Sequence, residues 1–142
     1  MKRRSVNPPP TEALYDRLHF SQATRAGDTI WVSGQVGIDA STMTPADGMD
    51  AQARIAFDGV RTVLEAAGAS LADIVELTTF HTGLRDDMTE FARVKDEYIP
   101  DRYPSWTAVG VSQLALDGLL VEIRAVAVAG SGDDRPDRSP GG

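Results

Sequence analysis

One carboxylate stands in the middle of a strongly apolar segment. Glu122 lies within residues 119–127, where the other side chains apart from Arg124 are leucine, valine, isoleucine or alanine. This pattern is typical of a β-strand. A carboxylate there could face solvent or form an ion pair at an interface. It could instead be held in a site whose apolar surroundings raise its pKa, where Glu122 would act as a general acid or base.

Trp106 is the second residue that could take part in chemistry. It begins an alternating, β-branched run immediately after Pro104 and Ser105. An aromatic face binds π-systems and cations, so Trp106 could form a lid or a stacking surface for a flat ligand. It could equally fill volume in a core or an interface, and the sequence leaves both interpretations open.

The remaining polar residues do not form a recognisable catalytic or metal motif. Ser33 could donate a hydrogen bond to a ligand, but no base lies near it in the sequence, which disfavours nucleophilic catalysis. His19 and His81 are the only histidines and lack metal-ligand spacing, and there are no cysteines. No glycine-rich phosphate loop is present. We therefore predict neither a metal site nor a cofactor site.

The composition indicates a globular, acidic protein. The 142 residues carry a formal net charge of −7 and are 42% hydrophobic, which is enough to build a core. An acidic surface repels phosphate backbones, so no nucleic-acid partner is expected. No apolar run approaches the length of a membrane span, and Met1-Lys2-Arg3-Arg4 is not followed by the apolar region of a signal peptide. We expect a cytoplasmic protein that does not bind membranes.

Periodicity and turn residues predict the elements that position these side chains. The expected order is strands 20–24 and 29–34, helix 49–67, strand 74–82, helix 87–98, and strands 106–112 and 119–128, with a bulge at Gly34 and a continuation over 35–38. Two helices and paired strands predict an α+β fold in which one mixed sheet is covered on a single face. The uncovered apolar face predicts a homo-oligomer.

The ends of the chain differ in composition from its centre. Residues 1–17 include three consecutive prolines and predict an extended lead-in. Residues 18–129 form the single expected domain. Residues 130–142 consist largely of glycine, serine, aspartate, arginine and proline, which predicts a disordered tail.

Six segments carry a resemblance to a known family. They are residues 20–23, 32–35, 64–71, 78–80, 104–111 and 121–127, with the sequences FSQA, VSGQ, LEAAGASL, TTF, PSWTAVGV and VEIRAVA. In order and spacing they resemble the Rid (YjgF/RidA) superfamily over about residues 18–128. The resemblance implies a chorismate-mutase-like α+β fold and a homotrimer. It also implies three clefts for small molecules, each between two subunits.

The resemblance also implies an activity, with one departure. The best-known members hydrolyse reactive enamines and imines, such as 2-aminoacrylate, to a keto acid and ammonia. They hold the substrate carboxylate with an arginine two residues after the proline that matches Pro104, and this chain has Trp106 there. Indole offers one neutral N–H in place of a charged fork. Losing a charge-assisted pair costs roughly 1.5–3 kcal/mol of binding, so altered specificity is expected.

Other positions of the cleft follow from the same resemblance. Glu122 matches the carboxylate that positions or activates the hydrolytic water, and Ser33 and Gly34 match the strand end that lines the cleft. Phe20 stands where tyrosine is frequent, and Lys95 stands where asparagine is frequent on the second helix. Lys95 could supply part of the missing positive charge. The expected substrate-binding residues are Trp106, Ser33, Gly34, Phe20, Lys95 and Thr107, and the expected catalytic residue is Glu122.

Three functions are compatible with these observations. The first is a Rid-like hydrolase that deaminates a small imine or enamine with altered specificity. The second is a non-catalytic trimeric protein that binds a small molecule. The third is an endoribonuclease or translation inhibitor, which the acidic charge disfavours.

Overall fold

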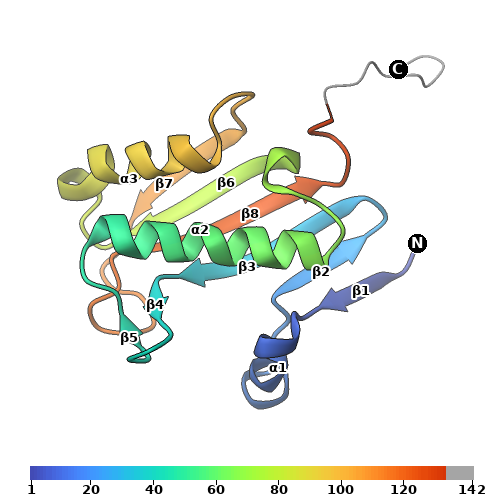
Figure 1. Ribbon diagram of the computed structural model, residues 1–142, viewed down its shortest axis with the longest axis horizontal. Coiled ribbons are helices and arrows are strands. Elements are labelled where there is room, and N and C mark those ends of the chain that lie inside the picture. The colour runs from blue at the N-terminus through green and yellow to red at the C-terminus, as the bar shows by residue number, and fades with distance from the viewer. Residues whose placement is uncertain (134–142) are drawn as a thin grey trace.

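The protein is built on one six-stranded mixed sheet. The computed structural model describes residues 1–133, so positions 134–142 of the expected tail lie outside the described residues. The strand order is β1-β2-β3-β8-β6-β7 (Figure 1). The bounds are β1 Arg3–Val6, β2 Ala23–Ala26, β3 Thr29–Val36, β6 Ile74–His81, β7 Ser105–Gly110 and β8 Val121–Val128. Strands β6 and β7 run parallel, and every other neighbouring pair in this sheet is antiparallel.

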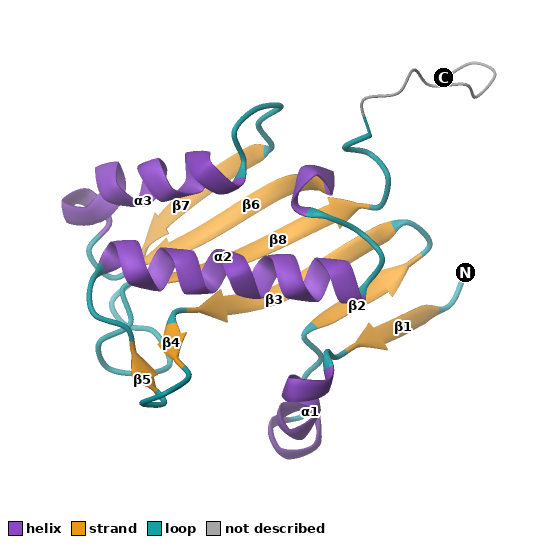
Figure 2. Cartoon of the chain, in the orientation of Figure 1, coloured by secondary structure: helices purple, strands orange, loops and turns teal. Residues whose placement is uncertain are grey.

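Two long helices cover one face of this sheet. Figures 1 and 2 show α2 (Met49–Ala66) and α3 (Leu84–Tyr98) lying side by side on that face. Their apolar stripes pack on alternate residues of the central strands. Fully buried members of this core include Phe57, Leu64, Phe91, Ile30, Leu77 and Ile123. The α+β fold with one covered face is confirmed. No helix within residues 1–133 has the length and apolarity that crossing a bilayer requires.

The opposite face of the sheet carries a mixture of apolar and charged side chains. Glu122 and Phe80 are paired across β8 and β6, and Val126 is paired with Trp31 of β3. Trp31 is 41% exposed, which is unusual for a tryptophan on a central strand. We call this surface the uncovered face.

The N-terminal segment differs from the extended lead-in that its prolines predicted. β1 pairs with β2 along the sheet edge, and a short helix, α1 (Glu12–Leu18), follows a helical turn at Pro9–Thr11. Val6 is buried, and the Asn7 side chain accepts a hydrogen bond from the Gln22 backbone N–H. These contacts join positions far apart in the sequence, so local composition did not reveal them.

Smaller differences occur where a strand is irregular. The predicted bulge in β3 is confirmed, because its register with β8 shifts between Val32 and Gln35. A second irregularity between Ile74 and Glu76 turns Ile74 into the core, whereas strict alternation from the buried Leu77 would put Ile74 on the opposite face. The polar loop 39–48 contains most of a two-stranded hairpin, β4 (Ile38–Asp39) and β5 (Thr44–Pro45).

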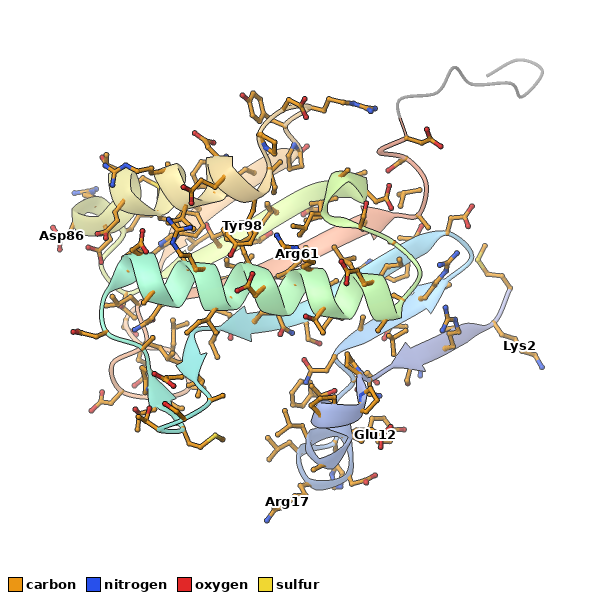
Figure 3. The ribbon with its side chains drawn as sticks, viewed as in Figure 1. Lys2, Glu12, Arg17, Arg61, Asp86 and Tyr98 are labelled. Carbon is orange, nitrogen blue, oxygen red and sulfur yellow. The ribbon has the colours of Figure 1, made fainter. Side chains whose placement is uncertain are left out.

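The two helices are joined through the Tyr98 side chain. Its ring stacks on Phe57 at a centroid distance of 5.0 Å, and the Arg61 guanidinium lies 5.0 Å from the centroid of the same ring. Its hydroxyl donates a hydrogen bond of 2.8 Å to Asp58 Oδ1. Figure 3 shows Arg61 and Tyr98 approaching each other between α2 and α3. These contacts help to fix α3 over the edge of the sheet that contains Trp106.

Candidate functional site

Glu122 lies on the uncovered face, against the bulge of β3. A Cβ atom placed on Gly34 would lie 2.5 Å from Glu122 Cδ and 2.8 Å from its Oε2, so only glycine leaves room for this carboxyl group. Partial burial raises the pKa of Glu122 above its ordinary value. Within residues 1–133, Glu122 has no ion-pair partner. Such a carboxyl group is suited to exchange protons with a substrate or water.

Ser33, next to Gly34 near the C-terminal end of β3, hydrogen-bonds to the segment that precedes β2. Its hydroxyl donates a 2.7 Å hydrogen bond to the Ser21 carbonyl, and its N–H donates to the Gln22 carbonyl at 2.8 Å. Phe20, 38% exposed, directly precedes Ser21 in the chain. Because the hydroxyl proton of Ser33 is already used, this oxygen is left to a ligand as an acceptor. We call Glu122, Gly34 and Ser33 the Glu122 group.

Trp106 lies on the other face of the sheet, under α3. It is paired with Leu77 in the parallel register of β6 and β7, and its ring is 6.0 Å from that of Phe91. The indole Nε1–H donates a 3.0 Å hydrogen bond to Thr79 Oγ1. Trp106 nevertheless remains 37% exposed. Its ring is packed on one side and exposed on another, and a stacking role for a ligand stays a prediction.

Lys95 of α3 lies against Trp106. Its Nζ lies 4.8 Å from the Trp106 ring centroid and 5.7 Å from that of Tyr103. The residue is only 9% exposed, and its ammonium hydrogen-bonds Asp96 Oδ1 at 3.2 Å. The positive charge therefore lies beside Trp106. We call Lys95, Trp106, Tyr103, Thr79 and His81 the Trp106 group.

His81 lies beneath this group. The side chain is fully buried, its Nε2 is 2.7 Å from Thr79 Oγ1, and its ring packs edge-on against Phe91 at 4.9 Å. Burial lowers the pKa of His81, with the negative charge of Asp87 acting in the opposite direction. Alternation placed Thr79 and His81 on one side of a strand. It gave no signal that Trp106 would join them.

The structure does not bring the two groups together within one chain. Residues 121, 123, 125 and 127 of β8 are buried under the helices, so Glu122 points to the uncovered face. Trp106 points to the covered face with Leu77. Thr107 is paired with Thr78 and, following the alternation of β7, faces away from Trp106. Of the predicted residues, the structure thus associates Ser33, Gly34 and Glu122 with one another, and Lys95 with Trp106.

The described part of the chain does not gather metal ligands into a cluster. Residues 1–133 contain no group of three or more histidine, cysteine, aspartate or glutamate side chains that could hold one. The chemistry available to the two groups is proton exchange at Glu122 and binding of an anion or a flat molecule at Lys95 and Trp106.

Comparison with known proteins places this fold in a family. The model of the family described as endoribonuclease L-PSP matches residues 10–129. The RutC family protein YjgH of Escherichia coli is 39% identical over 128 residues, which cover 89% of this chain and 95% of that protein. The 2-iminobutanoate/2-iminopropanoate deaminase of Salmonella typhimurium is 32% identical over 111 residues, which cover 77% of this chain and 86% of the enzyme.

Solved structures agree with this assignment. The structure of protein YJGH has a TM-score of 0.80 at 38% identity and covers 91% of this chain and 98% of its own. A member of the YjgF/YER057c/UK114 family from Mycobacterium tuberculosis has a TM-score of 0.78 at 29% identity and covers 90% and 100%, respectively. With the family model spanning most of the domain, this chain belongs to the endoribonuclease L-PSP family, within the Rid (YjgF/RidA) superfamily.

Proposed function

We propose that this protein hydrolyses a small reactive imine or enamine. The observation that carries the proposal is the Glu122 carboxyl group, which has no ion-pair partner within residues 1–133, has a raised pKa and fits closely against Gly34. The similarity to a 2-iminobutanoate/2-iminopropanoate deaminase supports this reaction class.

The reaction would use Glu122 twice. As a carboxylate, Glu122 takes a proton from water while the water oxygen bonds to the carbon of the C=N group. As an acid, it then gives that proton to the nitrogen, which leaves a carbinolamine. In a second cycle Glu122 takes the proton of the carbinol hydroxyl group and gives a proton to the amine nitrogen, so the C=O bond forms as the carbon–nitrogen bond breaks and ammonia leaves with its electron pair. The products are a carbonyl compound and ammonia. A raised pKa suits both steps, because burial makes this carboxyl group hold a proton more readily than an ordinary glutamate, which helps it to give the proton to nitrogen after taking it from water.

The cleft would be completed by a second subunit. The Glu122 group and the Trp106 group lie on opposite faces of one sheet, and the uncovered face exposes Trp31 and Val109. Exposed apolar surface of this kind marks an interaction site. We propose a homotrimer in which the Glu122 group of one subunit meets the Trp106 group of its neighbour, with a small molecule as the ligand.

The first experiment measures hydrolysis of imines generated in situ by an amino-acid oxidase. Glu122→Gln should lower the rate by about 100-fold or more, because it removes a general acid–base group. Glu65→Gln, at an exposed position of α2, is the matched control and should leave the rate unchanged.

The pH profile provides a second readout of the same experiment. The attacking step needs the ionised carboxylate, so the wild-type rate should rise as pH rises through the raised pKa of Glu122. Glu122→Gln should lose this rise. A variant that keeps both the wild-type rate and its pH profile would exclude Glu122 as the proton-transfer group.

A non-catalytic binding protein is the second candidate. The observation that favours it is Trp106 at the position where the resemblance expects an arginine. Saturable binding of small carboxylates by a wild-type protein that hydrolyses no imine would support this candidate. The net charge of −7 disfavours an endoribonuclease, since RNA is a polyanion.

A further inference from the structure

Lys95 combines deep burial with an incompletely satisfied charge. An ammonium group has three N–H donors, and within residues 1–133 its only hydrogen-bond acceptor is Asp96 Oδ1 at 3.2 Å. The Lys95 side chain is 11% exposed, whereas that of Asp96 is 64% exposed. An ion pair to so exposed a carboxylate is weak and is readily replaced by water or another anion.

Two aromatic rings hold this ammonium in place. Trp106 and Tyr103 lie 4.8 Å and 5.7 Å from Nζ, measured to their ring centroids. Such contacts attract a cation without neutralising it or occupying its N–H donors. The charge is therefore fixed in position and remains available to an anion.

A chain of hydrogen bonds through Thr79 to His81 fixes the orientation of the Trp106 ring. Trp106 Nε1–H donates to Thr79 Oγ1, and the Thr79 oxygen lies 2.7 Å from His81 Nε2. His81 Nε2 either accepts the hydroxyl proton of Thr79 or donates to its oxygen, depending on the tautomer, and in both cases Thr79 Oγ1 is hydrogen-bonded to the imidazole. Thr79 is thus the single group that connects the buried imidazole to the indole.

We propose that Lys95 is the anion-binding group of the cleft and that it binds the carboxylate of a small, flat, conjugated acid. Trp106 supplies the flat surface under the charge, and Thr79 is a positioning residue that acts through Trp106. The proposal deepens the proposed function, because an imino acid with conjugated C=N and carboxylate groups is such an acid. The Lys95 ammonium on α3 would take the place of the arginine that the resemblance expects at position 106 on β7. An ammonium group does not bind both carboxylate oxygens in one fixed geometry as a guanidinium does, so the orientation of the bound carboxylate is less constrained.

The binding test uses three probes with the full chain, measured by titration calorimetry. Benzoate is flat and charged, cyclohexanecarboxylate is charged without being flat, and benzamide is flat without charge. Benzoate should bind most tightly of the three. Lys95→Met, which keeps the length of the side chain, should weaken benzoate binding about 10- to 100-fold, and Lys95→Arg should recover part of it.

Thr79 is tested by a conservative pair of variants. Thr79→Val keeps the shape and removes the hydroxyl, so it should weaken benzoate binding and change the emission of Trp106, followed in a Trp31→Phe background. Thr79→Ser restores the hydroxyl and should restore both. A purely structural role for Thr79 would lower the unfolding temperature without changing the affinity of the folded protein for benzoate.

The two experiments distinguish failure of the Lys95 anion site from failure of the proposed imine hydrolysis. Wild-type benzoate affinity in Lys95→Met, or no benzoate binding by the wild-type chain, overturns the proposal even where Glu122→Gln abolishes hydrolysis. Conversely, Lys95-dependent benzoate binding by a protein that hydrolyses no imine supports the anion site and contradicts the hydrolase.

Discussion

Gly34 and Glu122 share one small volume on the uncovered face. The atoms that a Cβ on Gly34 would meet belong to the end of the flexible Glu122 side chain. In Gly34→Ala the carboxyl group would therefore swing away while the backbone stays in place. We expect imine hydrolysis to fall about 100-fold, since a shift of about 1 Å can have this effect. The free energy of unfolding should change by no more than about 1–3 kcal/mol, which is the range for overpacking.

The measurement for Gly34→Ala pairs hydrolysis rates with denaturant unfolding. Gly110→Ala, on the edge strand β7, is the matched control, because its new Cβ would meet Leu84 at an ordinary 3.6 Å. That control should keep both activity and stability. A fully active Gly34→Ala would show that the position of the Glu122 carboxyl group does not matter for the reaction.

At the scale of elements, Gln52 of α2 joins three segments of the chain. Its buried amide nitrogen donates to the carbonyls of Ala46 and Gly118 at 2.9 Å each, and its oxygen accepts from the Leu120 N–H at 2.8 Å. Gln52→Met would keep the volume and leave these backbone groups without partners. We expect the free energy of unfolding to fall by about 2–4 kcal/mol, because unsatisfied buried groups are costly.

Urea unfolding of Gln52→Met, with both the midpoint and the slope of the transition, measures this loss. Gln113→Met places the same substitution at an exposed glutamine of the loop that follows β7 and should change stability little. Equal losses in the two variants would mean that the buried amide does not hold the start of β8.

At the scale of the whole molecule, the uncovered face should be the contact between subunits. Trp31 is 41% exposed on it and is paired with Val126 of β8. Trp31→Glu would place a charge in a desolvated interface, so the mass in solution should fall from three chains to one chain of 15.2 kDa. Hydrolysis should fall with it, because the cleft would lose its second half.

Sedimentation equilibrium measures this change. Thr62→Glu adds the same charge at an exposed position of α2 and should leave the assembly intact. A wild-type protein that sediments as a single chain would contradict the intersubunit cleft. A trimeric Trp31→Glu would place the contact on another surface.

Local sequence predicted most of the elements for physical reasons that are themselves local. The apolar stripe of 49–67 predicted α2, and Gly68, with φ +89°, ends it where a residue with a side chain would be strained. The capping box of Ser70 and Asp73 fixed the turn at Leu71–Asp73. The start of α3 was placed three residues late, at 87 in place of Leu84, because helix ends depend on weak terminal contacts.

By itself the sequence determined the strands β2, β3, β6, β7 and β8, the two main helices and the bulge in β3, and it singled out Glu122 and Trp106 as candidates, because periodicity and residue chemistry are local properties. Only the tertiary structure decided which side chains meet. Thr79 and Trp106 are 27 positions apart and touch through the parallel register of β6 and β7. Val6 is buried through its pairing with Ala23. The two faces of one sheet also separate Glu122 from Trp106, since strand pairing and helix packing set these directions.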